Sequence, residues 1–277
     1  MLSDFHLHTC VSDGDLDPSA LVARAAAHGI GHMAITDHDS LGAYRWGEGQ
    51  VFEDARRLGV ALTVGTELDT VLDGKEVHLL GYDVDLSSAE LGAHLDEAQR
   101  ARRERARRDV ELVQAQLGED AIREDQVFVP GRETLMRGHL IRPLVARGRF
   151  ASYEEGQAWF EEHVRNEVVV PKPTLAEAAA MIAAAGGWAS LAHPGYYWKD
   201  GFPVLERLAA LPALGVEAVE LEYPYRLSSP DLFSEEDERE FTVSLRATGE
   251  ELGLRFTRGS DAHRAADLER LYGPTPA

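Results

Sequence analysis

Histidines and carboxylates recur in short motifs along the whole chain, and both residue types can bind metal ions or transfer protons. His6 and His8 are two residues apart, so on a strand both imidazoles would point to the same face. The other candidates lie in separate segments, namely Asp37-His38, Glu67, His78, His193 and the pair Asp261 and His263. Each falls at or just after the carboxyl end of a predicted strand.

This set of side chains favours metal chemistry. Imidazole nitrogens combined with carboxylate oxygens suit Zn, Fe or Mn, whereas many structural zinc sites use cysteine thiolates. Cys10 is the single cysteine, which excludes a thiolate cluster and a disulfide within the chain. The candidate ligands exceed the needs of one ion, so we expect two or three divalent transition metal ions (Mn, Fe or Zn) as cofactors.

Alternating strand and helix patterns predict how these residues are brought together. Strand-like runs occupy 2–9, 33–36, 60–64 and 77–82, with helices at 19–28 and 49–58. The same rhythm resumes with a helix at 175–185 and strand-like runs at 188–194, 216–221 and 256–263. This pattern predicts an α/β fold of parallel strand–helix units. In a closed parallel barrel the carboxyl ends of the strands meet at one face, where active sites lie.

The middle of the chain departs from this rhythm. Residues 89–117 read as one long helix, and the rest of 89–170 contains helical patches without clear strands. We therefore expect 1–88 and 171–277 to form the barrel and 89–170 to be a helical insertion. Six arginines in the run 100–108 alternate with acidic residues at helical spacing, which predicts a solvated, ion-paired helix face.

Composition limits the classes of partner. The chain has 277 residues, 44% of them hydrophobic, and a formal net charge of −20. This charge argues against binding long nucleic acid, because that binding requires basic patches. No apolar run reaches the roughly 18 residues of a membrane span, and polar residues interrupt the amino terminus before a secretory signal could form. We expect a cytoplasmic protein without membrane contact.

Several motifs resemble those of a known family, the PHP (polymerase and histidinol phosphatase) family of metal-dependent phosphoesterases. The run Asp4-Phe5-His6-Leu7-His8-Thr9 with Ser12-Asp13-Gly14 resembles its first motif, and Thr36-Asp37-His38-Asp39 resembles its second. Glu67 in Val-Gly-Thr-Glu resembles the bridging glutamate. Ala192-His193-Pro194-Gly195 and Gly259-Ser260-Asp261-Ala262-His263 resemble the third and fourth motifs. The resemblance implies a distorted (β/α)7 barrel with a centre of two or three metals.

The same resemblance implies a set of ligands for each ion. One ion would be held by His6, His8, Glu67 and Asp261. A second would be held by Glu67, His78 and His193, with Glu67 as the bridge. A third would be held by Asp13, His38 and His263.

The insertion carries a further motif. Arg137-Gly138-His139-Leu140-Ile141-Arg142 resembles the Arg-x-His-x-x-Arg segment of PHP proteins that act on nucleotides with two phosphates, and of related 5′-to-3′ exoribonucleases. Arg137 and Arg142 offer planar guanidinium groups suited to phosphate, and His139 can add a donor. These three residues are therefore the expected substrate-binding residues.

Together these features predict a metal-dependent phosphoesterase acting on a phosphorylated small molecule. Metal-activated water would attack phosphorus, and the residue that protonates the leaving group is not assigned. The favoured substrate is a nucleoside 3′,5′-bisphosphate, which would lose its 3′-phosphate to give a 5′-mononucleotide. The alternatives are a 5′-to-3′ exonuclease on short RNA or DNA oligonucleotides, a histidinol-phosphate phosphatase, and a non-catalytic metal-binding module.

Overall fold

Seven strands in chain order make up the sheet of the computed structural model, which describes residues 1–273. The strands are β1 Leu2–Asp4, β2 Ile30–Ile35, β3 Ala61–Leu72, β4 Lys75–Tyr82, β5 Trp188–Leu191, β6 Ala218–Glu222 and β7 Arg255–Arg258. The sheet closes on itself, because the N–H of Phe5 donates to the carbonyl of Arg258 (2.9 Å) and that of Asp261 to His6 (2.8 Å). The result is a distorted (β/α)7 barrel, as the resemblance implied.

Helices cover the outside of this barrel. They are α1 Pro18–Ala27, α2 Gln50–Leu58, α7 Leu175–Ala184, α8 Pro194–Lys199, α9 Val204–Arg207, α10 Tyr225–Ser228, α11 Glu235–Leu252 and α12 Ala265–Tyr272. Asp17 caps α1 by accepting the N–H of Ala20 at 2.8 Å, and Pro18 occupies the first turn, where its missing N–H costs nothing. One continuous cluster of buried apolar side chains joins strands and helices.

Strand β4 corrects the expectation of parallel strand–helix units throughout. β3 and β4 are joined at Asp73 and Gly74, both of which have positive φ, and β4 runs antiparallel to both β3 and β5. No crossover helix is needed for such a hairpin. As a consequence, Glu67 and His78 lie within strands β3 and β4 and not at their carboxyl ends.

The first predicted strand is also shorter than expected. Regular pairing with β2 ends at Asp4, and the following residues pair instead with the segment after β7, through a parallel bridge between Leu7 and Ala262. His6 and His8 therefore lie beyond β1, in the segment that closes the barrel. Their rings still lie together, with centroids 5.2 Å apart.

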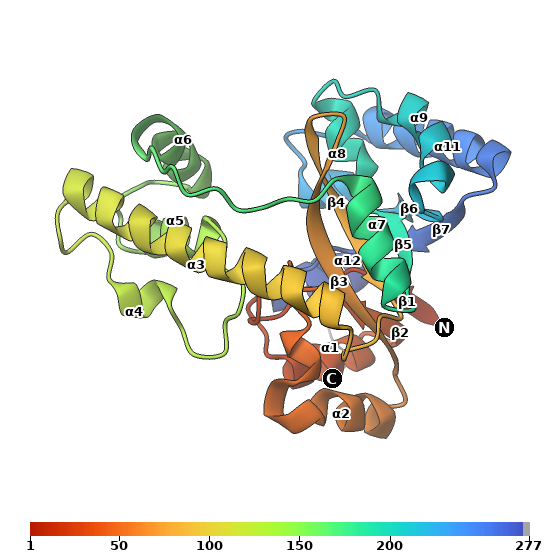
Figure 1. The fold of residues 1–277 in the computed structure, drawn as a ribbon, viewed down its shortest axis with the longest axis horizontal. Coiled ribbons are helices and arrows are strands. Elements are labelled where there is room, and N and C mark those ends of the chain that lie inside the picture. Colours follow the sequence, from red (N-terminus) through yellow and green to blue (C-terminus); the bar gives the residue numbers. More distant parts are fainter. Residues whose placement is uncertain (274–277) are drawn as a thin grey trace.

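Residues 89–170 form α3 Ala89–Leu117, α4 Glu124–Val127, α5 Gly138–Ala146 and α6 Tyr153–His163. The bounds of α3 are those predicted. Figure 1 shows α3 extending from the barrel to one side, where α4, α5 and α6 surround its far half. A separate apolar cluster, including Val110, Ile141 and Phe160, holds these helices together. No helix among residues 1–273 combines the length and apolarity needed to cross a bilayer.

Candidate metal centre

Histidine and carboxylate side chains from both ends of the chain converge at the barrel. Three groups have donor atoms within 4.8 Å of one another, and they are His6, His8, Glu67 and Asp261; His8, Asp13, His38 and His263; and His38, Glu67 and His78. His193 joins the third group, because its Nε2 lies 3.1 Å from Oε1 of Glu67. The structure thus brings together all nine residues that the family resemblance implied as ligands.

Glu67 lies at the middle of the centre and is almost completely buried. Its Oε2 lies 3.3 Å from Nε2 of His6, 3.3 Å from Nε2 of His8 and 3.1 Å from Nδ1 of His38. Its Oε1 lies 2.9 Å from Nδ1 of His78 and 3.1 Å from Nε2 of His193. One carboxylate therefore faces imidazoles on two sides, as a bridging ligand must.

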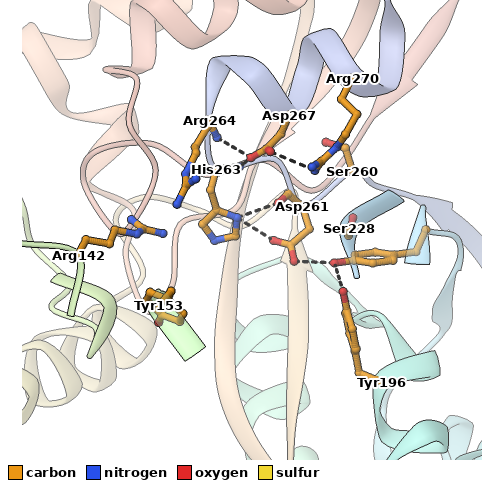
Figure 2. Close-up of a pocket in the computed structure, with 11 residues that line it drawn as sticks. Arg142, Tyr153, Tyr196, Ser228, Ser260, Asp261, His263, Arg264, Asp267 and Arg270 are labelled. Atoms are coloured by element: carbon orange, nitrogen blue, oxygen red, sulfur yellow. Dashed lines mark hydrogen bonds and ion pairs between the residues drawn. The ribbon is translucent and has the colours of Figure 1, made fainter. Parts of the chain in front are cut away.

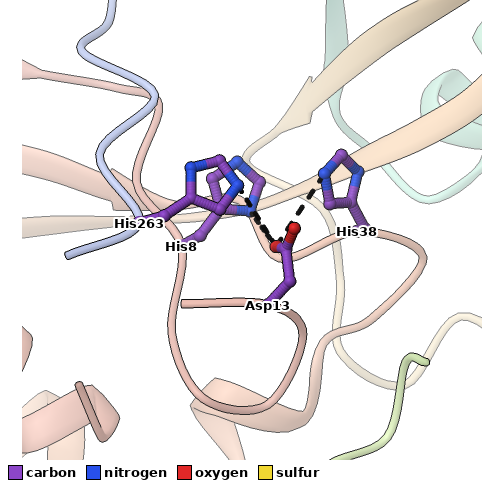
Figure 3. Close-up of side chains that lie close together, drawn as sticks. All are labelled: His8, Asp13, His38 and His263. Atoms are coloured by element: carbon purple, nitrogen blue, oxygen red, sulfur yellow. Dashed lines mark ion pairs between the residues drawn. The ribbon is translucent and has the colours of Figure 1, made fainter. Parts of the chain in front are cut away.

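Asp13 is the carboxylate of the group drawn in Figure 3. Its Oδ1 lies 3.2 Å from Nε2 of His263, 3.8 Å from Nδ1 of His8 and 4.0 Å from Nε2 of His38. His8 and His38 each present their other nitrogen to Glu67. A neutral imidazole has one unprotonated nitrogen, so each of these rings can serve an ion on one side only.

The buried atoms at this centre fit metal ions better than they fit one another. Nε2 of His6, both nitrogens of His8, Nδ1 of His38 and Oε2 of Glu67 are buried and make no hydrogen bond within residues 1–273. Buried polar atoms are normally satisfied, so a group of unsatisfied donor atoms aimed at one another indicates a missing partner. Imidazole nitrogen and carboxylate oxygen are ligands of Mn, Fe and Zn.

The carboxylates give this centre a strongly negative potential. Burial lowers the pKa of His8, but the nearby carboxylates of Asp261 and Glu67 outweigh burial and raise it to about 10. At His78, burial also lowers the pKa, but the negative charge of Glu67 outweighs burial, and the pKa is raised to about 9. Without metal, protons would neutralise this potential; divalent cations can replace them.

Glu220, a carboxylate that the sequence analysis did not assign, positions two of the candidate ligands. Glu220 in β6 is fully buried; its Oε1 lies 3.1 Å from Nδ1 of His6, and its Oε2 accepts the N–H of His193 at 2.7 Å. A Cβ on Gly259 would overlap both Glu220 and His6, so this motif glycine permits a close approach. A carboxylate on the second nitrogen of a histidine ligand fixes ring orientation and tautomer.

Asp37, which the sequence offered as a candidate ligand, has another role. Its carboxylate accepts the N–H of Thr9 at 2.7 Å and the hydroxyls of Thr9 and Ser12, each at 2.6 Å. It belongs to none of the three ligand groups. Asp37 therefore holds the loop that carries Asp13.

Arg102 corrects the expectation that the arginine run of α3 is solvated. Its guanidinium is 8% exposed and donates to Asp39 at 2.8 Å and to Asp69 at 2.7 Å. Asp69 also lies 3.5 Å from Nε2 of His78. The arginine thus connects the insertion to strand β3 beside the metal centre, whereas Arg108 pairs with Glu111 at the surface as expected.

Three of the six non-glycine residues with positive φ among residues 1–273 lie at or beside this centre. Asp39, His193 and Asp261 have φ values of +43°, +28° and +54°, although none is glycine. Such conformations cost about 1–3 kcal/mol each and persist where surrounding structure enforces them. At His193 and Asp261 the strained backbone aims a candidate ligand at Glu67 and at His8, respectively.

The three substrate-binding candidates of the insertion do not lie together. Arg142 lines a cavity beside Asp261 and His263, whereas Arg137 lines a second cavity beside Asp69 and His78. His139 lines neither cavity. Burial, together with nearby Arg132, lowers the pKa of His139 to about 3, and its Nδ1 accepts the N–H of Met136 at 2.9 Å. It is therefore a neutral ring with its proton on Nε2.

Comparison with known proteins decides the family. A model of the PHP domain matches residues 4–170, which is more than half of the chain. The chain belongs to the PHP domain family. With its buried histidine and carboxylate centre, this PHP protein is a metal-dependent phosphoester hydrolase.

Curated relatives of this PHP protein include an exoribonuclease and a phosphatase. It is 32% identical over 200 residues to the 5′-3′ exoribonuclease Rnm of Escherichia coli, covering 71% of this chain and 67% of the relative. It is 28% identical over 277 residues to the 3′,5′-nucleoside bisphosphate phosphatase of Chromobacterium violaceum. That alignment covers 98% of this chain and 90% of the relative.

Solved structures of similar proteins agree with the fold. A metal-dependent phosphoesterase from Bifidobacterium adolescentis superposes with a TM-score of 0.75 at 27% identity, covering 94% of this chain and 87% of that one. An amidohydrolase from Chromobacterium violaceum, solved with bound sulfate and no metal, gives a TM-score of 0.74 at 26% identity, covering 95% and 88%.

Proposed function

We propose that this PHP protein removes the 3′-phosphate of nucleoside 3′,5′-bisphosphates to give 5′-mononucleotides. The observation that carries the proposal is the position of Arg142, in a cavity that also exposes Asp261 and His263 of the ligand groups. A phosphate held at the ligand groups would therefore have a guanidinium beside it for a second phosphate. The bisphosphate phosphatase of Chromobacterium violaceum, similar along almost the whole chain, supports the same substrate.

We assign the ligands as three sets. His6, His8, Glu67 and Asp261 hold one ion, Glu67 with His78 and His193 holds a second, and Asp13 with His38 and His263 holds a third. The positions of the unsatisfied nitrogens and of Glu67 between the first two sets support this assignment. The third set is the weakest, because His8 and His38 also face Glu67.

The ions would supply Lewis acidity and lower the pKa of bound water. The chain itself supplies position and charge. Glu67 fixes the spacing of the first two sets, and Glu220 orients His6 and holds the backbone of His193. Tyr223 donates to Oδ2 of Asp261 at 2.9 Å, which leaves Oδ1 facing His8 at 2.9 Å. Arg142 then orients the substrate by its second phosphate.

We further propose that residues 89–170 act as a substrate cap on a barrel made of 1–88 and 171–277. The insertion has its own apolar cluster, and it contacts the centre through Arg102 and Arg142. Its two arginine-lined cavities lie on either side of the ligand groups.

A 5′-to-3′ exonuclease on short RNA or DNA oligonucleotides is the second candidate. The observation in its favour is that cavities lie on both sides of the centre, at Asp261 and His263 and at Asp69 and His78. A phosphodiester has a nucleotide on each side of the scissile phosphate and could use both. The exoribonuclease relatives agree with this candidate. Histidinol phosphate would leave the arginines of the insertion without a purpose.

Analysis of two products, inorganic phosphate and mononucleotides, distinguishes these candidates. Manganese-, iron- and zinc-loaded protein is assayed separately on adenosine 3′,5′-bisphosphate, adenosine 3′-monophosphate, histidinol phosphate and a 5′-phosphorylated trinucleotide. The proposal expects the highest kcat/KM on the bisphosphate. A higher kcat/KM on the trinucleotide, with mononucleotides released from its 5′ end, would replace it with the exonuclease.

A further inference from the structure

A second arginine lines the same cavity as Arg142, and it comes from the barrel. This cavity, of about 380 Å³, is lined on the side of the insertion by Arg142 of α5 and Tyr153 of α6. Arg264, the residue after His263, belongs to the barrel and also lines this cavity. Figure 2 shows the guanidinium groups of Arg142 and Arg264 pointing toward each other beside His263, with Tyr153 next to them.

Arg142 is held in place but is not neutralised. Its Nη1 donates to the main-chain oxygen of Asp13 at 3.0 Å, and its buried Nε has no hydrogen-bond partner within residues 1–273. The contact with Asp13 fixes the guanidinium beside the ligand groups without supplying a negative charge. Arg142 therefore retains donors for an anion.

The guanidinium of Arg264 is also not neutralised by a close carboxylate. Its side chain is 53% exposed, and its Nε lies 4.0 Å from a carboxylate oxygen of Asp15, which is at the limit of an ion pair. Asp267, which also lines the cavity, accepts from Arg270 at 3.1 Å and from the main-chain N–H of Arg264 at 2.9 Å. The carboxylates of the cavity wall thus already have partners other than the Arg264 guanidinium.

The resulting local charge is opposite to that of the protein. Three arginines and two aspartates line the cavity, in a chain with a formal net charge of −20. Two guanidinium groups directed at one space repel each other unless an anion lies between them. Such a pair, with planar forks of donors, matches the oxygens of a phosphate.

We propose that Arg264 is a specificity-determining residue that binds, together with Arg142, the substrate phosphate that is not hydrolysed. This inference rests on the proposed function. Arg264 follows His263 directly, so a phosphate between the two guanidinium groups would lie next to one held at the ligand groups. Tyr153 closes the cavity beside them and can donate its hydroxyl. Arg142 and Arg264 together form a phosphate clamp. This clamp therefore selects substrates with two neighbouring phosphates.

Comparison of two nucleotides that differ by one phosphate tests this role. Manganese-loaded Arg264→Ala is assayed on adenosine 3′,5′-bisphosphate and on adenosine 3′-monophosphate. We expect kcat/KM on the bisphosphate to fall about ten- to hundred-fold, and kcat/KM on the monophosphate to stay within about threefold. Arg264→Lys keeps the positive charge but loses the planar fork of donors. Its kcat/KM on the bisphosphate should lie between those of wild type and Arg264→Ala.

Arg239→Ala serves as the matched control, because Arg239 is an exposed arginine of α11 that pairs with Glu236. It should behave as wild type on both nucleotides. Equal losses on both nucleotides in Arg264→Ala, or no loss on either, would overturn the clamp while leaving the proposed function standing. If the wild type releases phosphate from neither nucleotide, the proposed function fails and the clamp fails with it.

Discussion

Oε1 of Glu220 lies 3.1 Å from Nδ1 of His6, although 214 residues separate them in the chain. The same carboxylate accepts the main-chain N–H of His193 through Oε2. Glu220 thus positions candidate ligands of two different ions, and it does so from β6, which itself supplies no ligand to the centre.

Replacing Glu220 by glutamine should weaken metal binding. The amide lacks the charge that keeps His6 basic and oriented, so we expect metal affinity to fall about 10- to 100-fold. Competition with a fluorescent chelator measures this affinity. Glu222→Gln is the control, because Glu222 is an exposed residue of the same strand that faces Arg258. Unchanged affinity in Glu220→Gln would show that the contact does not support the metal.

Metal content gives the most direct test of the centre. Protein purified without chelator should contain two to three ions of Mn, Fe or Zn per chain by elemental analysis. Chelation should abolish phosphoesterase activity and lower Tm, because ions that bind only the folded state stabilise it. Fewer than one ion per chain, with no activity gained on adding metal, would contradict the proposed centre.

Glu67→Gln and His193→Ala should abolish turnover while the fold remains intact. A bridging carboxylate sets the spacing of two ions and the acidity of water between them, so its loss should raise the barrier by several kcal/mol. Steady-state kinetics and circular dichroism provide the measurements. If Glu67→Gln stays within about tenfold of wild type, roughly 1.4 kcal/mol, Glu67 is not a bridge.

Arg142→Ala should separate substrate recognition from metal chemistry, and Arg137→Ala, which alters a different cavity, should lower kcat/KM on a bisphosphate less. Each charge-assisted contact to phosphate is worth about 1.5–3 kcal/mol, which corresponds to a roughly ten- to hundred-fold loss of kcat/KM on a bisphosphate. p-Nitrophenyl phosphate has no second phosphate and should be affected much less. Equal losses on both substrates would assign these arginines to the reacting phosphate or to folding.

Arg102→Met should destabilise the protein. It leaves the buried carboxylates of Asp39 and Asp69 without their shared partner, which costs about 3–5 kcal/mol of unfolding free energy. Urea denaturation measures the loss. Arg108→Met removes an exposed pair with Glu111 and should cost at most about 1 kcal/mol. Similar losses in both variants would mean that Arg102 contributes no more than a surface arginine.

The sequence by itself indicated which residues the structure brings together at the candidate metal centre. Several of them lie in short motifs near predicted strand ends, namely His6 and His8, His38, His193, and Asp261 with His263. Histidine and aspartate are common metal ligands, so these candidates can be recognised from the local sequence. The bounds of α3 also followed from sequence, because a long helical pattern depends on neighbours a few residues away.

Tertiary structure decided how those residues are used. In the sequence, nothing distinguishes Glu220 from other acidic residues of strands. Its role depends on the contact with His6, which only the folded chain makes. Arg137 and Arg142 belong to one motif yet face different cavities. Arg102, which the sequence placed on a solvated helix face, is buried against Asp39 and Asp69. Each of these outcomes depends on the direction of side chains that meet across distant segments, and local spacing carries no information about that direction.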